Sequence, residues 1–157
     1  MFDTEAILHK AEAAVTSSGY GTTVVDGEDT AKVVNLGAGL VRGNLVVDLN
    51  HIVARSNEKY TLHLMGGDDS DFTKQVSLCS KELGAAGALE GNLTSKLSRI
   101  VIPFQNEQAG TIYPYVRVRH VIAGDNPSIN YTARLEKDLP VTGTTALNQT
   151  TTTTTTV

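Results

Sequence analysis

The sequence predicts an all-β fold, an eight-stranded antiparallel sandwich. From Thr22 to Glu136, apolar residues alternate with polar ones at a period of two, as in strands that have one buried and one solvated face. Turn-forming residues separate these runs at the short spacing that is typical of sandwiches and barrels. No helical pattern falls between the runs, which disfavours a parallel α/β sheet.

The first segment, residues 1–21, is predicted to be an N-terminal arm or a short helix. Asp3 or Thr4 could cap a helix, and Gly19 could end it. Four apolar residues recur there at helical spacing: Ile7, Leu8, Ala11 and Val15. So narrow a stripe does not stabilise a helix alone, so the segment must dock on its own domain or on another chain. The sequence leaves both open.

Residues 22–139 are assigned to the sandwich. The predicted strands are Thr22–Asp26, Ala31–Leu36, Gly43–Val53, Lys59–Met65, Phe72–Cys79, Ser98–Gln105, Thr111–Ile122 and Ser128–Glu136. Two sheets of this kind bury their dry faces together, and eight strands in two antiparallel sheets is the number in a jelly roll. Pro103 and Pro114 interrupt two of the runs. We expect them on edges or bulges, because proline cannot donate to the ladder.

The last segment, residues 140–157, is predicted to be an extended C-terminal arm. It carries an unbroken run of threonine from Thr150 to Thr156. A polar homopolymer cannot form a core, yet β-branched threonine favours extended backbone. Disorder is the default expectation for such a segment; an ordered arm would have to lie on another surface, for which a neighbouring subunit is the natural candidate, with Thr150, Thr153 and Val157 among its contacts.

Composition narrows the function. Hydrophobic residues make up 40% of the 157 and aromatics 5%, with no Trp, so the core must be mainly aliphatic. A formal net charge of −4 disfavours nucleic acid and anionic membranes as partners. We see no secretory signal and no apolar run near the roughly 20 residues of a membrane helix, and expect a soluble chain made in a bacterial cytoplasm. Cys79, the single cysteine, is expected to be a half-buried small hydrophobe.

No motif indicates an enzyme. The four histidines, His9, His51, His63 and His120, form no His-x-His pair, and each is expected to be a surface or half-buried strand residue. The acidic loop Asp68–Asp71 lacks the ligand spacing of a calcium-binding helix-loop-helix and is expected to be a solvated turn. Phosphate-loop, dinucleotide and nucleophile-elbow motifs are missing from the sequence. We therefore predict no catalytic, cofactor or metal site.

One stripe suggests an interface. Alternation places four residues on one sheet face, opposite the core-facing Val116 and Val118: Tyr113, Tyr115, Arg117 and Arg119. Tyr and Arg are enriched at protein interfaces. Ordinary cross-strand packing is the alternative, with the arginines neutralised by Glu107, Glu136 or Asp138. The predicted interface also includes three residues of the first segment: Phe2, Ile7 and Leu8.

Three stretches carry a resemblance to a known family. They are Met1–Asp3 with Lys10–Thr16, Val33–Gly37, and Arg99–Pro103 with Tyr115–Gly124. Together they resemble the capsid decoration, or cement, protein family typified by the Bordetella podovirus cement protein. The resemblance spans about residues 1–136, and residues 137–157 have no counterpart in it.

The resemblance implies a jelly roll that self-associates, as a homodimer or homotrimer, and stabilises a phage head by binding the outside of its major capsid protein shell. It implies a place on the virion exterior, no catalysis and no cofactor. The alternative is a carbohydrate- or receptor-binding sandwich of a virion or cell surface, with Tyr113 and Tyr115 stacking on sugars. Such platforms usually favour Trp, which this sequence lacks.

Overall fold

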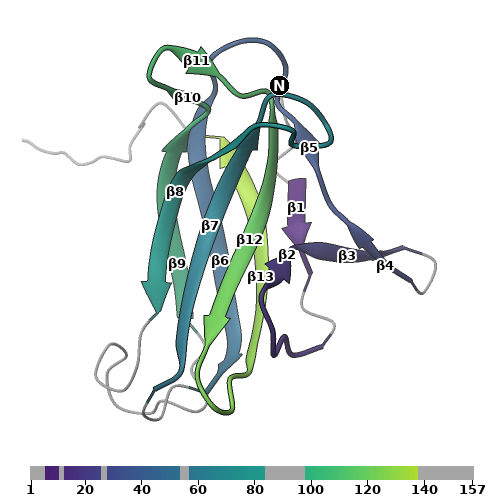
Figure 1. Ribbon diagram of the computed structural model, residues 1–157, viewed down its shortest axis with the longest axis vertical. Helices are drawn as coiled ribbons and strands as arrows, with labels where there is room; N and C mark the ends of the chain where they lie inside the picture. The colour runs from purple at the N-terminus through teal and green to yellow at the C-terminus, as the bar shows by residue number, and fades with distance from the viewer. Residues whose placement is uncertain (1–5, 11–12, 26–27, 54–56, 84–97, 138–157) are drawn as a thin grey trace, which may run out of the picture.

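The computed structural model describes residues 6–10, 13–25, 28–53, 57–83 and 98–137, and every regular element in them is a β-strand (Figure 1). The predicted all-β sandwich is confirmed. The strands are β1 (Ala6–His9), β2 (Gly19–Tyr20), β3 (Thr22–Val25), β4 (Glu28–Ala31), β5 (Val34–Asn35), β6 (Arg42–Ile52), β7 (Lys59–Gly67), β8 (Gln75–Leu83), β9 (Ser98–Gln105), β10 (Glu107–Gln108), β11 (Thr111–Ile112), β12 (Tyr115–Ala123) and β13 (Ile129–Lys137).

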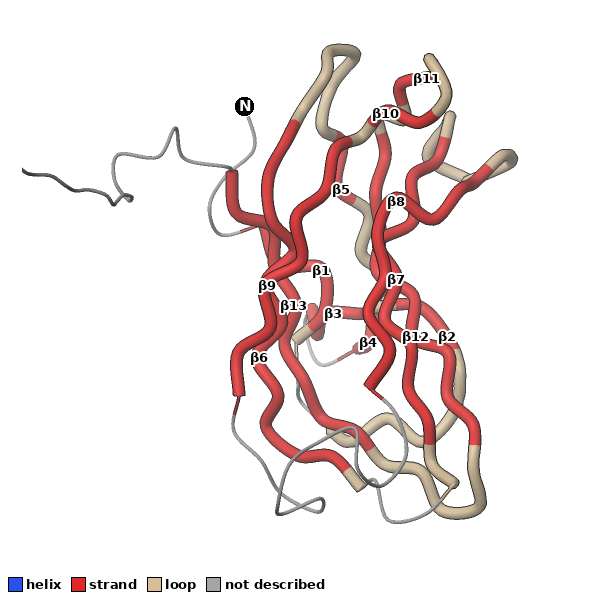
Figure 2. The backbone as a smooth tube through the Cα atoms, turned by 90° about the vertical axis from the view of Figure 1, so that its left-hand side faces the viewer, coloured by secondary structure: helices blue, strands red, loops and turns tan. Residues whose placement is uncertain are grey.

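Two antiparallel sheets face each other. The first has four strands in the order β1-β13-β6-β9, and the second has the order β2-β12-β7-β8, with β5 also pairing with β12. Figure 2 shows the two layers from the side. The hairpins β3–β4 and β10–β11 form separate two-stranded units. In the described residues the two sheets therefore have four and five strands, nine rather than the eight predicted, and the finer jelly-roll assignment stays a prediction.

Two prolines lie where a missing backbone N–H does not break a central strand. The predicted run Thr111–Ile122 is split into β11 and β12, with Pro114 between them. Pro103 lies in β9, which among the described residues pairs with β6 alone and is an edge strand, as expected. A second predicted run, Ala31–Leu36, is also divided, because β4 ends at Ala31 and β5 covers only Val34–Asn35.

The predicted helix between Asp3 and Ser18 is wrong for the residues that the structure describes. Ala6–His9 is strand β1, which pairs with β13 from Ala6 opposite Leu135, and Val15 forms a bridge with Ile129. A short helix gains little on its own, whereas pairing with a core strand satisfies the backbone and buries Leu8. The segment is part of the sandwich, because β1 joins the first sheet and β2 joins the second.

The core lies between the sheets and is mainly aliphatic, as the composition predicts. On β12, Val116 and Val118 are fully buried while Arg117 and Arg119 are half-buried on the outer face. The largest fully buried side chains come from four strands, β1, β6, β7 and β13: Tyr60, Tyr131, Leu8, Leu45, Leu49, Ile52, Leu62, Leu64, Ile129 and Leu135. Inward and outward residues therefore alternate along the strands as the period of two requires.

Gly66 and Gly67, which follow the predicted strand Lys59–Met65, are the last two residues of β7. A Cβ added at Gly67 would lie 2.5 Å from the Phe72 ring, so that ring packs directly on the strand backbone. The turn follows at Asp68, whose backbone N–H donates to the carbonyl of Lys74 at 3.2 Å.

The acidic loop is a turn at the surface, as expected, and its own carboxylates shape it. Asp69 Oδ1 accepts from the backbone N–H groups of Asp71 and Thr73, each at 3.0 Å, and Asp68 Oδ1 accepts from Lys74 N–H at 2.9 Å. Hydrogen bonds from Thr73 are the main cause that lowers the pKa of Asp69. The acidic loop is therefore ordered by its own backbone donors.

Candidate interaction surface

The guanidinium of Arg117 lies between two aromatic rings on the outer face of the second sheet. Its Cζ atom is 3.6 Å from the ring centroid of Tyr20 and 4.0 Å from that of Phe72. Its Nη2 donates to Gln75 Oε1 at 3.1 Å. A cation over an aromatic face is attracted by the ring quadrupole, so the two rings hold the guanidinium in place. We call Tyr20, Phe72 and Arg117 the Arg117 clamp.

Three elements that are distant in sequence build the clamp. Arg117 is on β12, Tyr20 is on β2 opposite Arg119, and Phe72 comes from the turn after β7. Phe72 has φ of 58°, in the left-handed region that a bulky side chain rarely adopts. The ring reaches Arg117 across Gly67, where a side chain would block it. The strained backbone of Phe72 thus positions its ring on the guanidinium of Arg117.

Arg119 extends the cationic surface beyond the clamp. Its Cζ is 5.9 Å from the Tyr20 centroid, and it lies opposite His63 of β7. Burial, and then the charge of Arg119, lowers the pKa of His63, which bonds Ser77 Oγ through Nδ1 at 2.9 Å. His63 therefore adds little positive charge at neutral pH.

Within the described residues, neither Arg117 nor Arg119 forms an ion pair. The carboxylates that the sequence offered as partners are engaged elsewhere: Glu136 binds Arg134 at 2.9 Å, and Glu107 accepts from the backbone N–H of Gly110 at 3.0 Å. Asp138 lies outside the described residues. Arg117 and Arg119 thus present two guanidinium groups without an ion-pair partner among the described residues, on the outer face of the second sheet of a chain of net charge −4.

The outer face of the first sheet is different, because its charges pair with one another. Asp48 binds Arg99 at 2.7 Å and Arg134 at 2.5 Å. The hydrogen bond from Arg99 is the largest cause that lowers the pKa of Asp48, and the bond to Asp48 raises the pKa of Arg134. A face whose charges are internally paired offers less to a charged partner than the face of Arg117 and Arg119 does.

The structure brings three of the four predicted stripe residues together. Tyr115, Arg117 and Arg119 are half-buried on the outer face of β12. Tyr113 precedes Pro114, and its Cβ lies beside Gly66, whereas Phe72 lies on Gly67. Successive strand residues face opposite sides, so Tyr113 is on the other side of the sheet. The stripe therefore begins at Tyr115.

The other predicted interface residues fall into two groups. Leu8 is fully buried in the core of its own chain and is not exposed to a partner, while Ile7 is half-buried on β1. Phe2, Thr150, Thr153 and Val157 lie outside the described residues. An interface role for these and for Ile7 stays a prediction.

Sequence reasoning missed a buried polar cluster. His9 and His120 are 4% and 3% exposed, so the expectation of surface or half-buried histidines is wrong for both; it holds for His51 and His63. The ring of Tyr131 stacks on His9 with centroids 4.3 Å apart, and His9 Nδ1 accepts from the backbone N–H of Thr22 at 3.1 Å. Hydrogen bonding of this kind is what permits imidazoles in a core.

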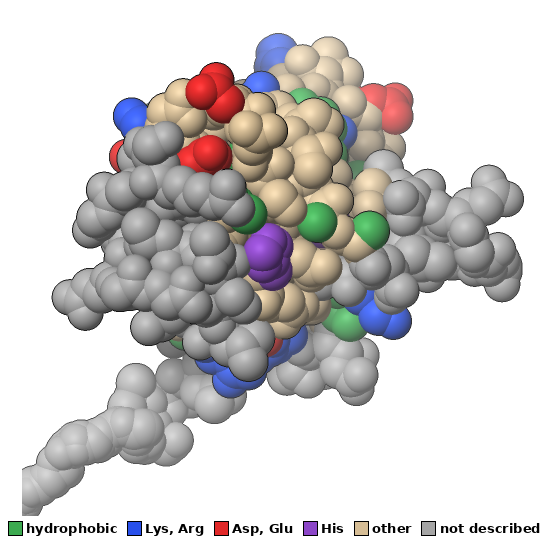
Figure 3. Space-filling model, turned by 90° about the horizontal axis from the view of Figure 1, so that it is seen from below, with side chains coloured by type: hydrophobic (Ala, Val, Ile, Leu, Met, Phe, Trp, Pro, Cys, Tyr) green, Lys and Arg blue, Asp and Glu red, His purple; other side chains and the backbone are tan. Residues whose placement is uncertain are grey.

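Large exposed hydrophobic residues are few in the described part: Leu40, Val101 and Ile112. Figure 3, which views the end of the sandwich opposite the β10–β11 hairpin, shows hydrophobic side chains singly among polar ones. A partner would therefore meet a mixed aromatic and cationic surface, not a broad apolar patch.

The described residues include few groups suited to metal binding or nucleophilic chemistry. In the described ranges no group of three or more His, Cys, Asp or Glu could hold a metal ion. Cys79 is half-buried, and burial raises its pKa to about 11, which keeps the thiol protonated. Among the described residues there is also no helix long and apolar enough to cross a membrane.

Comparison with known proteins adds no relative. No family model matches the chain, and no curated protein matches it. The likeness to cement proteins therefore rests on the three sequence stretches alone.

Proposed function

We propose that the chain is a non-catalytic structural protein of a phage particle, a capsid decoration or cement protein that binds the outside of the head through the Arg117 clamp and Arg119. The observation that carries this proposal is the pair of arginines that lack an ion pair in the described structure, set among Tyr20, Phe72 and Tyr115. Tyr and Arg are the residues in which binding hot spots are richest.

The physical role follows from binding that depends on assembly. A protein that binds only the closed shell stabilises it by mass action, in proportion to the logarithm of its concentration over its dissociation constant. If it also self-associates, each further contact to the shell is made at a raised effective concentration. A body with a fixed cationic surface suits this role when the shell presents carboxylates, which Arg binds through paired hydrogen bonds.

The test is binding to heads of the phage that encodes the chain. Purified heads stripped of the protein are mixed with the full chain and sedimented, and we expect the chain to pellet with them and to raise the temperature at which they open. Arg119→Glu should abolish binding while the circular dichroism spectrum stays unchanged. Lys59→Glu is the matched control, because Lys59 is exposed at the far end of β7 from the clamp.

Two results would reject the proposal: a chain that fails to bind stripped heads, or an Arg119→Glu variant that binds as well as the unaltered chain. The alternative, a carbohydrate-binding module, is tested with a glycan array. We expect no binding to the array, because Tyr113 and Tyr115 lie on opposite sides of the sheet and cannot form one stacking platform.

A further inference from the structure

His63 and Arg119 face each other on the outer side of the second sheet. They are directly opposite in the antiparallel register of β7 and β12, which places their Cβ atoms about 4.5–5.5 Å apart on the same face. Both side chains are half-buried, and Arg119 forms no ion pair among the described residues. A negative group that binds Arg119 therefore comes close to the His63 imidazole.

Ser77 and Cys79 determine how the imidazole uses its two nitrogens. His63 Nδ1 is 2.9 Å from Ser77 Oγ, and the Ser77 hydroxyl donates to the Cys79 carbonyl at 3.3 Å. Because the hydroxyl proton is used on that carbonyl, the ring proton is assigned to Nδ1, which donates to Ser77, and the neutral ring has no proton at Nε2. Protonation of His63 thus adds a positive charge and an N–H donor while the bond to Ser77 is kept.

The charge on Arg119 acts on this imidazole. The titratable and charged groups that face His63 come from three strands: Arg117 and Arg119 on β12, Tyr20 on β2, and Lys81 and Glu82 on β8. Burial is the largest cause that lowers the pKa of His63, and the charge of Arg119 is the other. An anion that neutralises Arg119 removes the second cause and so favours the charged imidazole.

We propose that Arg119 and His63 form one proton-linked site for the carboxylates of a partner, in which Arg119 binds the anion and protonation of His63 tightens the binding. The two equilibria are reciprocal, because an anion that favours charged His63 is bound more tightly by the charged form, and by the same factor. Attachment therefore strengthens as the pH falls below neutral, over a range in which carboxylates stay ionised. The inference rests on the proposed function, since it takes Arg119 as a binding residue, and adds regulation by pH.

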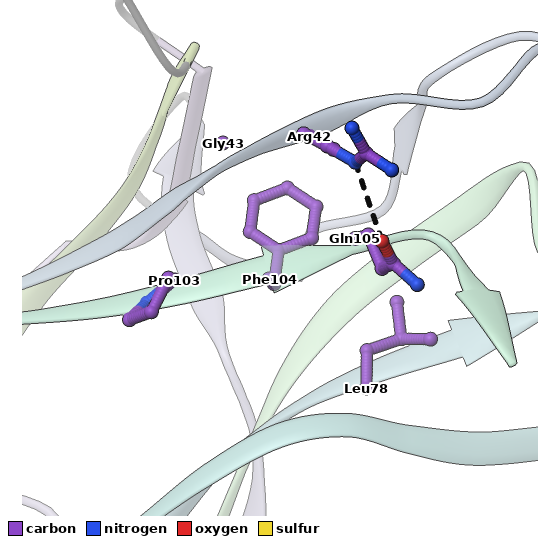
Figure 4. Close-up of a pocket in the computed structure, with 6 residues that line it drawn as sticks. All are labelled: Arg42, Gly43, Leu78, Pro103, Phe104 and Gln105. Atoms are coloured by element: carbon purple, nitrogen blue, oxygen red, sulfur yellow. Dashed lines mark hydrogen bonds between the residues drawn. The ribbon is translucent and has the colours of Figure 1, made fainter. Parts of the chain in front are cut away.

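Arg42 provides a matched control, an arginine that has no imidazole beside it. It lies at the rim of a groove of about 360 Å³, where its Nε donates to Gln105 Oε1 at 3.3 Å (Figure 4). The remaining lining residues have no titratable side chain: Gly43, Leu78, Pro103 and Phe104. Arg42 can attract an anion, but no neighbour in the groove takes up a proton in response.

The test uses sulfate as the probe, because sulfate stays ionised between about pH 7.5 and about pH 5. The full chain is titrated over this range by NMR, in sulfate and in chloride of equal ionic strength. We expect sulfate to raise the pKa of His63 by about 0.5, the effect of a nearby charge in a partly solvated site. By linkage, the affinity for sulfate, followed at the Arg119 amide, should rise about threefold as the pH falls.

Three variants assign the effect to named residues. His63→Asn keeps a donor for Ser77 but does not titrate, so its affinity for sulfate should stay constant over the range. Arg119→Gln should abolish the effect of sulfate on the pKa of His63, whereas Arg42→Gln should leave that effect intact.

The inference is overturned if sulfate does not change the pKa of His63, if its effect persists in Arg119→Gln, or if His63→Asn shows the same rise in affinity. Sedimentation with stripped heads judges the proposed function separately. Heads that bind equally well at both ends of the pH range would reject the linkage and leave attachment standing. Heads that do not bind at all would reject the proposed function, while the sulfate titration still decides whether His63 and Arg119 are coupled.

Discussion

The imidazole Nδ1 of His120 and the phenolic oxygen of Tyr131 are hydrogen-bonded at 2.7 Å inside the core. Because β12 belongs to the second sheet and β13 to the first, this bond links the two layers. Burial lowers the pKa of His120 to about 4, with a smaller effect from His9, and raises the pKa of Tyr131. Both groups are therefore neutral at pH 7, and the link is a bond between uncharged partners.

Acidification should weaken the fold through His120. Its pKa is about 4 in the folded chain and near 6.5 when unfolded, so between these values the unfolded state binds a proton that the folded state does not. The contribution is fully present above pH 6.5 and is lost as the pH falls toward 4, by about 3 kcal/mol in total. Urea unfolding at a series of pH values measures it.

The control for this prediction is His120→Gln, whose amide can bond Tyr131 but does not titrate. The slope of unfolding free energy against pH between 6.5 and 4 should be smaller in the variant than in the unaltered chain. Groups far from residue 120 that titrate in both proteins contribute to both slopes and cancel in the difference. Parallel curves would show that His120 does not govern this pH range.

Gly67→Ala should displace the Phe72 ring and disrupt the Arg117 clamp. The new methyl would sit 2.5 Å from the ring, and overpacking of this kind costs roughly 1–3 kcal/mol. Thermal unfolding gives the loss of stability, and the loss of binding to heads reports on the clamp. Gly39→Ala is the matched control, since a Cβ there meets nothing within 4 Å. If the two variants have the same midpoint of thermal unfolding, the close packing of Phe72 on β7 is not important for stability.

Ala109→Asn should stabilise the β10–β11 hairpin. Ala109 and Gly110 form the two-residue turn between Gln108 and Thr111, and both have positive φ, 52° and 83°. Asn-Gly is the preferred pair for such a turn, and left-handed backbone costs a residue such as Ala about 1–2 kcal/mol, part of which Asn recovers. A rise in the unfolding midpoint is expected. A fall would mean that this hairpin does not adopt the turn described.

Cys79 should react slowly with iodoacetamide in the native chain and rapidly in denaturant. Burial raises the pKa of its thiol to about 11, so little thiolate exists at pH 7.5, and the half-buried position limits access. Mass spectrometry after timed labelling measures both rates. Rapid labelling of the folded chain would contradict the description of Cys79 as a packed, unreactive side chain.

Periodicity was sufficient to predict most strands. The run Ser98–Gln105 coincides with β9, and the outward positions of Arg117 and Arg119 follow from the buried Val116 and Val118. These features depend on the alternation of neighbouring residues, which a sequence displays directly. Pro103 on an edge strand follows equally from its missing N–H.

Long-range contacts were beyond local pattern. Ile7, Leu8, Ala11 and Val15 recur at helical spacing, yet the pairing of β1 with β13 decides the structure of Ala6–His9. Tyr20, Phe72 and Arg117 meet only after three elements assemble, and the segments that hold His9, His120 and Tyr131 carry no shared motif. Partner identity in a sheet is set by tertiary packing, so none of these sites could be derived from spacing.

The pairing of β1 with β13 has a consequence for biosynthesis. Ala6 pairs with Leu135, so the partner strand of β1 is synthesised long after β1 itself. During translation β1 stays unpaired until β13 has left the ribosome. Contacts between positions so distant in sequence slow folding, so we expect this sheet to form late on the folding pathway.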